Sequence, residues 1–159
     1  MRRIYFVFAL LLTTTLANGQ FSNNALGLRL GAGDGLGTEI SFQHKLTDIN
    51  RIELDLCMLS GNNYTAWSFA GIYQWVWELN GGFNWYAGAG GRLGTWSWDN
   101  SYTGHDGGGI LLGAVGDIGI EYSFPSGIQL GLDARPEIGL INHGNAFRNN
   151  YAFSVRYRF

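Results

Sequence analysis

Cysteine, proline and charge are all scarce in this sequence. Cys57 is the single cysteine among 159 residues, so no disulfide can form within the chain, although small exported domains usually depend on disulfides. Only two prolines are present. Charged residues make up 14% of the chain, against about a quarter in ordinary soluble domains. Interactions other than disulfides must therefore stabilise the fold. The low content of charged residues also indicates that little of the surface is exposed to water.

Long hydrophobic runs are also missing beyond the N-terminus. No segment after residue 19 has the ~18 consecutive apolar residues of a membrane helix. If this part of the chain spans a membrane, it can do so only as a closed barrel, because lipid cannot satisfy the open edge of a sheet. Glycine, by contrast, is abundant at 25 residues, and aromatic residues reach 15%. These numbers suit a β protein of one domain.

Residues 1–19 have the pattern of a secretory signal peptide. Two arginines open the segment, an apolar stretch follows through Leu12, and Ala17–Gly19 forms a small-x-small cleavage site. The apolar stretch is too short to serve comfortably as an uncleaved membrane anchor. We therefore expect a signal peptide at 1–19 and a β-barrel domain at 20–159. That domain has 8 basic and 12 acidic residues, a net charge of −4, which does not favour nucleic acid as a partner.

The last nine residues alternate without interruption between two kinds of side chain. Successive side chains of a strand point to opposite faces, so one face here is aromatic or aliphatic and the other is small or cationic. The printed sequence also ends on an aromatic residue. A carboxy-terminal strand of this type resembles the signal that hands bacterial outer-membrane barrels to their assembly machinery. The residues of this expected assembly signal are Tyr151, Phe153, Val155, Tyr157 and Phe159.

Seven earlier segments alternate in the same way, which predicts eight strands in all. The fourth segment is ambiguous, because Ile72 and Val76 fall on its polar face, and either a β-bulge or a mixed face would explain this. The start of the sixth, Ile110–Leu112, has no clear register, so the register is left open across 64–77 and 108–114. The expected strands are 26–31, 39–45, 51–58, 67–77, 84–93, 114–122, 128–137 and 151–159.

The connections between these segments alternate in length. Turns rich in Gly, Pro, Asn or Asp occupy 47–50, 78–82 and 125–127, whereas the connections at 98–109 and 140–150 are long. The first connection is a short exception among the long ones. Short turns at one rim and long loops at the other are typical of outer-membrane barrels, whose short turns face the periplasm.

Nearly all charges of the expected strands fall on one face. No Asp, Glu, Lys or Arg lies on the apolar face, and His44 is the one ionisable exception. A soluble barrel of the lipocalin or streptavidin type would turn these charges outward. A membrane barrel must keep them inside, because an outward Lys or Arg at mid-bilayer costs roughly 2–4 kcal/mol. Buried charges need partners, so the sequence predicts an ion network in the lumen. Its expected members are Arg29, Glu39, Lys45, Arg51, Glu53, Asp55, Arg92, Asp117, Glu121, Asp133, Arg135, Glu137, Arg156 and Arg158.

Aromatic residues are expected to form belts at both membrane interfaces. One group lies near the strand ends that carry the short turns, namely Tyr73, Trp75, Trp77, Trp85, Tyr122, Phe124, Tyr157 and Phe159. The other group lies towards the opposite rim, namely Trp67, Trp96, Trp98, Tyr102 and Tyr151.

Strand number, loop asymmetry and the terminal strand together resemble the small eight-stranded outer-membrane barrels of the outer membrane protein A and X type, over residues 24–159. The resemblance implies an all-β, antiparallel, up-and-down transmembrane β-barrel in the outer membrane of a Gram-negative-type bacterium. It also implies contact with outer-membrane lipids and with the barrel assembly machinery. A structural or surface-contact role is expected, with an extracellular partner at loops 98–109 and 140–150. Eight strands leave a lumen that side chains can fill, so we expect no porin-like conductance.

No complete catalytic, cofactor or metal site is evident in the sequence. Two glycine-rich stretches lack the spacing of a nucleotide-binding loop, and His105 with His143 would make at most a weak metal site. Residues 142–146 invite comparison with the lipid A deacylases, eight-stranded barrels that carry a His-x-Ser-Asn run with a downstream acid. Here Gly144 stands at the position of the nucleophile. A lipid-modifying barrel enzyme and a soluble secreted ligand-binding barrel are the two alternatives.

Overall fold

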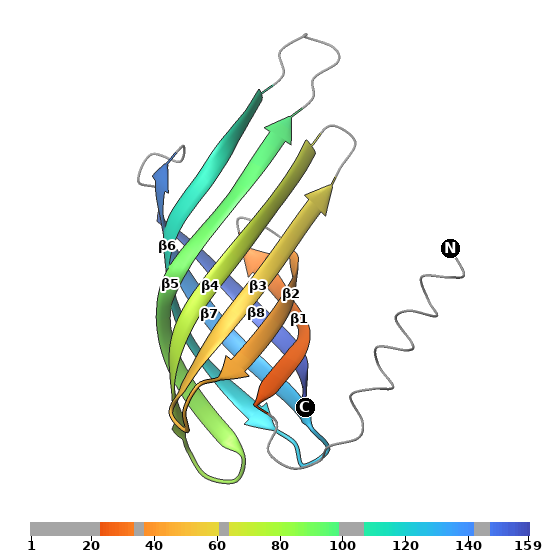
Figure 1. The fold of residues 1–159 in the computed structure, drawn as a ribbon, viewed down its shortest axis with the longest axis vertical. Helices are drawn as coiled ribbons and strands as arrows, with labels where there is room; N and C mark the ends of the chain where they lie inside the picture. Colours follow the sequence, from red (N-terminus) through yellow and green to blue (C-terminus); the bar gives the residue numbers. More distant parts are fainter. Residues whose placement is uncertain (1–22, 34–36, 61–63, 99–106, 142–146) are drawn as a thin grey trace, which may run out of the picture.

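The protein is a closed barrel of eight antiparallel strands (Figure 1). A computed structural model describes residues 23–33, 37–60, 64–98, 107–141 and 147–159. Each strand is hydrogen-bonded to the next along the chain, and β1 pairs with β8 to close the sheet. In this part of the chain no helix is long and apolar enough to cross a membrane. The strands are β1 (Asn24–Gly33), β2 (Thr38–Lys45), β3 (Asn50–Ser60), β4 (Tyr64–Glu78), β5 (Phe83–Trp98), β6 (Gly107–Ser123), β7 (Ile128–Ile141) and β8 (Phe147–Arg158).

Alternation along each strand sorts the side chains as the sequence predicts. In β8, Ala152, Ser154 and Arg156 are buried, whereas Phe153 and Val155 between them are exposed. The ambiguous fourth strand has a mixed face and no bulge. Its pairing with β5 runs without a register shift, and its apolar side chain Ile72 is buried in the lumen.

The register shift of this barrel lies elsewhere, between β6 and β7. Leu112 is opposite Ile141, and the next residue, Gly113, is opposite Gly139. One extra residue of β7 is therefore accommodated at this point, as in a β-bulge. The shift lies within 108–114, the stretch of β6 whose register the sequence left open.

Several strands extend further than the sequence pattern predicts. The expected loop 98–109 is shortened at both ends, because β5 continues through Trp98 and β6 begins at Gly107. The expected loop 140–150 is shortened likewise, by β7 through Ile141 and by β8 from Phe147. Glycines at the start of β6 and polar residues on both faces of early β8 conceal the alternation there. Residues 99–106 and 142–146 lie outside the described part.

The two rims of the barrel differ. We call the rim with the turns 46–49, 79–82 and 124–127 the terminal rim, because Asn24 and Phe159 meet there through two backbone hydrogen bonds of 3.2 and 2.9 Å. The opposite rim is called the loop rim. The wall between them has unequal height, since β2 has 8 residues and β6 has 17. Figure 1 shows β4, β5 and β6 rising well beyond β1 and β2 at the loop rim.

The inside of the barrel is polar and its outside is apolar. Large side chains that are fully buried include Arg29, Arg135 and Arg156, whereas Leu28 and Leu132 are 47% and 58% exposed on the outer wall. A soluble barrel with this arrangement would expose a continuous apolar surface to water, which soluble proteins rarely do. The prediction of a transmembrane barrel is confirmed, and the soluble secreted barrel is excluded.

Candidate functional site: the charged lumen

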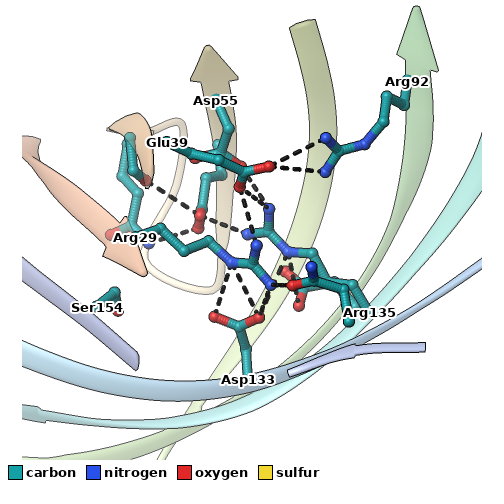
Figure 2. Close-up of polar contacts among 12 residues, drawn as sticks. Arg29, Glu39, Asp55, Arg92, Asp133, Arg135 and Ser154 are labelled. Atoms are coloured by element: carbon teal, nitrogen blue, oxygen red, sulfur yellow. Dashed lines mark hydrogen bonds and ion pairs between the residues drawn. The ribbon is translucent and has the colours of Figure 1, made fainter. Parts of the chain in front are cut away.

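A hub of buried carboxylates and guanidinium groups occupies the middle of the lumen. Arg135 on β7 contacts two carboxylates of β3, with its Nη2 2.6 Å from Glu53 Oε1 and its Nη1 2.5 Å from Asp55 Oδ2. Arg156 on β8 reaches the same Glu53 oxygen at 2.6 Å. Figure 2 shows Arg135 crossing the lumen towards the carboxylates of the opposite wall. The hub therefore ties β3 to β7 and β8 from inside.

Towards the loop rim the network continues through Glu39 on β2. Arg29 on β1 donates to Glu39 Oε2 at 2.9 Å and also pairs with Asp133 on β7. Arg92 on β5 reaches the other oxygen of Glu39, with both terminal nitrogens at 3.0 Å (Figure 2). Its Nε lies 3.2 Å from Glu137 on β7. Glu39 thus links three strands at this level.

Towards the terminal rim the network ends in the pair Arg51–Glu121, which joins β3 to β6 at 2.7 Å. The guanidinium of Arg51 also lies over the ring of Tyr86, 4.7 Å from its centroid, which is a cation–π geometry. Gln74 accepts a hydrogen bond from Arg51 Nε at 2.5 Å and donates to Asp117 at 2.5 Å. The amide of Gln74 therefore links the terminal-rim pair to the central hub through hydrogen bonds.

Neutral polar residues complete the network, and charge-based reasoning on the sequence missed them. Glu53 accepts hydrogen bonds from Gln43 at 2.7 Å, from Gln74 at 2.9 Å and from Ser41 at 3.2 Å, in addition to its two arginines. These side chains matter because the buried cations are fewer than the buried carboxylates. Their alternation with apolar neighbours placed them on the polar face, which is the signal that could have identified them.

Two residues of the expected ion network lie apart from it. Lys45 is exposed beside the terminal-rim turn and pairs with Asp48 at 2.9 Å, and that hydrogen bond lowers the pKa of the Asp48 carboxyl. Arg158 donates to the backbone carbonyl of Phe124 at 3.2 Å. Both residues follow the polar face of their strands. They sit so close to the rim that water and turn atoms, not lumen carboxylates, are their neighbours.

The aromatic residues of the terminal rim form close pairs on the outer wall. Trp77 and Trp85 stack with their ring centroids 4.2 Å apart, and Tyr122 contacts Phe124 at 4.6 Å. Trp96 is a correction to the expected belt at the loop rim. It shares the lumen-facing register of Arg92 on β5, because the two are an even number of residues apart.

Among the other aromatic residues expected at the loop rim, two have described side chains and one lies outside the described part of the chain. Trp67 and Tyr151 are exposed on the outer wall, whereas Tyr102 lies outside the described residues.

Metal-ligating residues are not clustered in the part of the chain that the structure describes. Among the described residues no group of three or more His, Cys, Asp or Glu residues is arranged to hold a metal ion. His105, His143 and the segment 142–146 compared with the deacylases lie outside the described part. Cys57 is a buried free thiol on the lumen side of β3.

Comparison with known proteins identifies the fold. No protein-family model matches the sequence, and no curated protein sequence matches it. The N-terminal β-barrel domain of OprF from Pseudomonas aeruginosa superposes with a TM-score of 0.70 at 16% identity, over 88% of this chain and 100% of that chain. Neisserial surface protein A superposes with a TM-score of 0.64 at 17% identity, over 86% and 94%.

The attachment invasion locus protein Ail of Yersinia pestis is a third similar structure. It has a TM-score of 0.56 at 13% identity, over 87% of this chain and 97% of that chain. Ail has also been solved in complex with the heparin analogue sucrose octasulfate. The expected location in the outer membrane agrees with these neighbours. By its fold, this chain is a small eight-stranded β-barrel of the outer-membrane type.

Proposed function

We propose that this protein is an integral outer-membrane barrel with a closed lumen, which serves the envelope as a structural element and contacts the surroundings through its loop rim. The observation that supports the proposal is the buried network from Glu39 to Glu121, in which mutually bonded side chains cross the middle of the lumen. A porin of larger strand number keeps water along its axis. Here a permeating ion would have to displace Arg135 and Arg156 from Glu53, at ion-pair distances of 2.6 Å.

The network also supports a structural role in the membrane. Each lumen charge would be costly in a low-dielectric interior without a partner. The pairs connect strands that are not neighbours in the sheet, such as β3 with β7. The barrel is therefore braced across its axis as well as around its wall.

Surface contact is supported by the composition of the loop-rim connections. The segments 34–36, 61–63, 99–106 and 142–146 contain no Lys or Arg and carry Asp34, Asp99 and Asp106. They are otherwise rich in Asn and Gly, with Ser, Thr and Tyr in the longest one, which resembles the composition of adaptable binding loops. The absence of cations in these segments does not favour a sulfated polysaccharide of the kind that the Ail complex represents. We propose a neutral or basic partner instead.

Conductance measurement tests the closed lumen. The chain without residues 1–19, refolded and inserted in planar lipid bilayers, is expected to show no steady porin-like current steps. A matched variant with Glu53→Ala and Arg135→Ala removes the hub and should raise the current, provided that it still folds by the gel-mobility criterion given below. Steady ohmic steps from the unaltered protein would refute the proposal.

Adhesion measurement tests the surface-contact role. Cells that display the protein are compared with cells in which residues 99–106 are replaced by a Gly-Ser linker of equal length. Binding to immobilised basic proteins is expected to fall for the replaced loop. Equal binding at equal surface expression would remove that loop from the proposal.

A further inference from the structure

A polar vestibule opens at the terminal rim, between the short turns and the Arg51–Glu121 end of the network described above. Its volume is about 420 Å³, and residues from all eight strands line it. Its inner end is closed by the Arg51–Glu121 pair and by the hub behind that pair. The vestibule is thus a dead-end pocket that is open only on the side of the short turns, which face the periplasm in barrels of this type.

The lining of this vestibule is balanced in charge and rich in amides. Lys45, Arg51 and Arg158 supply three cations, and Asp48, Glu78 and Glu121 supply three anions. Amide side chains lie between them, among them Asn84 and Gln129. Lys45 already pairs with Asp48, and Arg51 with Glu121. Arg158 and Glu78 are left as the cation and the anion of the lining without an ion pair among the described residues, so a ligand with charge of one sign alone would oppose one of them.

Hydrogen-bonding atoms of the vestibule lack partners among the described residues. Two are donors, Arg51 Nη2 and Arg158 Nε, and three are acceptors, Asn50 Oδ1, Glu121 Oε2 and Gln129 Oε1. Arg51, Glu121 and Gln129 are 7%, 3% and 3% exposed. Native proteins nearly always satisfy buried polar groups, so these atoms indicate a missing partner. That partner reaches them only if their side chains turn towards the opening, because each atom is almost completely covered in this conformation. The missing partner must accept hydrogen bonds on one side and donate them on the other.

We infer that the vestibule binds the zwitterionic end groups of a short peptide. A carboxylate meets the free donors of Arg51 and Arg158, and an ammonium or amide N–H meets Glu121, Gln129 and the exposed Glu78. The volume falls in the usual range of small-ligand pockets, about 300–1,000 Å³. A free dipeptide carries both end groups within that space. The site is independent of the loop rim and of its partner.

Peptide titration of the folded protein tests this inference. The chain without residues 1–19 is refolded in detergent micelles with isotope-labelled side-chain amides, and the NMR signals of Asn84 and Gln129 are followed. The probes are alanyl-alanine, its N-acetyl form, its C-terminal amide, and glucose. Alanyl-alanine should shift both signals in a saturable way at millimolar concentration. Each blocked form should bind roughly tenfold more weakly, as expected for the loss of a charged hydrogen bond.

Variants at the mouth of the vestibule assign the two ends of the peptide. Arg158→Gln should weaken binding of alanyl-alanine but add little to the loss caused by amidation, because both changes remove the same interaction. Glu78→Gln should behave in the same way with N-acetylation. Ser126→Ala, in the turn after β6 and outside the lining, is the matched control and should bind as the unaltered protein does.

Three results would overturn the inference. Signals that do not move, or that drift in proportion to peptide concentration, would mean that water alone fills the vestibule. Equal shifts with glucose would mean a general polar pocket and no recognition of charged ends. Equal affinity for the free and the blocked dipeptides would exclude the assigned contacts even if a peptide binds.

Discussion

At the scale of single residues, Gly119 shows how tightly the lumen is filled. It lies on the lumen face of β6 beside Tyr86, whose side chain is fully buried. A Cβ at Gly119 would lie 2.4 Å from Tyr86 Cζ and 2.7 Å from the carbonyl oxygen of Leu132. The ring of Tyr86 therefore occupies the space that any larger residue would need.

Gly119→Ala is predicted to lower the free energy of unfolding by about 1–3 kcal/mol, the usual cost of overpacking. The measurement is urea unfolding in lipid vesicles followed by tryptophan fluorescence. Gly91→Ala is the control, because the nearest atom to a Cβ there is 3.6 Å away. The same unfolding midpoint for both variants would contradict the packing described for Tyr86.

Arg135 is the residue on which most carboxylates of the lumen converge. Its guanidinium lies within 4 Å of five of them, on β2, β3, β6 and β7. Arg135→Gln should destabilise the barrel by about 3–5 kcal/mol, because carboxylates would remain buried without their cation. Arg158→Gln, which removes a cation bonded to one carbonyl at the rim, should cost about 0.5–1.5 kcal/mol. Equal losses in the same urea assay would mean that burial does not set the strength of these contacts.

At the scale of elements, alternation determines which side chains meet lipid. Leu132 on β7 is 58% exposed and flanked by the buried Gly131 and Asp133. A shift of the register by one residue would place the carboxylate of Asp133 in hydrocarbon. The polar and apolar faces therefore fix the register of β7 without help from the turns.

Leu132→Arg should lower the stability of the inserted barrel by roughly 2–4 kcal/mol, the cost of an arginine facing lipid near the middle of the membrane. The folded fraction after insertion into vesicles is the measurement. Leu132→Phe keeps the apolar surface and should insert as the unaltered chain does. Normal insertion of the arginine variant would place Leu132 away from the lipid.

At the scale of the whole molecule, closure depends on the pairing of the first strand with the last. β1 and β8 are in register from Ala25 opposite Arg158 to Gly33 opposite Asn150. Closure removes the free edges that lipid could not satisfy. The lumen network adds bonds across the axis, so wall and interior stabilise one another.

A folded barrel of this kind should resist unfolding in detergent and migrate differently on a gel before and after boiling. The chain without residues 1–19 is expected to show this heat-modifiable mobility. A chain truncated before Phe147 lacks β8, cannot close, and should migrate the same whether or not it is boiled. A mobility shift in the truncated chain would contradict the closed topology.

The sequence alone determined the strand number, the inversion of polarity and the face of every strand except in 64–77 and 108–114. These features follow from local periodicity, since side chains two residues apart share a face wherever the strand lies. Strand ends were predicted less well. Gly107–Gly109 and Arg148–Asn150 give no alternation of polarity, and the pairing with neighbouring strands decides that they are extended.

Only the tertiary structure decided which lumen residues meet. Arg135 and Glu53 are 82 residues apart, and no local pattern specifies that partnership. It depends on the height of each strand in the barrel, which also leaves Lys45 and Arg158 at the rim. The vestibule arises in the same way, because its lining is assembled from all eight strands. Periodicity along a strand determines whether a side chain points into the lumen or towards lipid. The stagger of the strands and the closure of the barrel determine which lumen side chains come within contact distance.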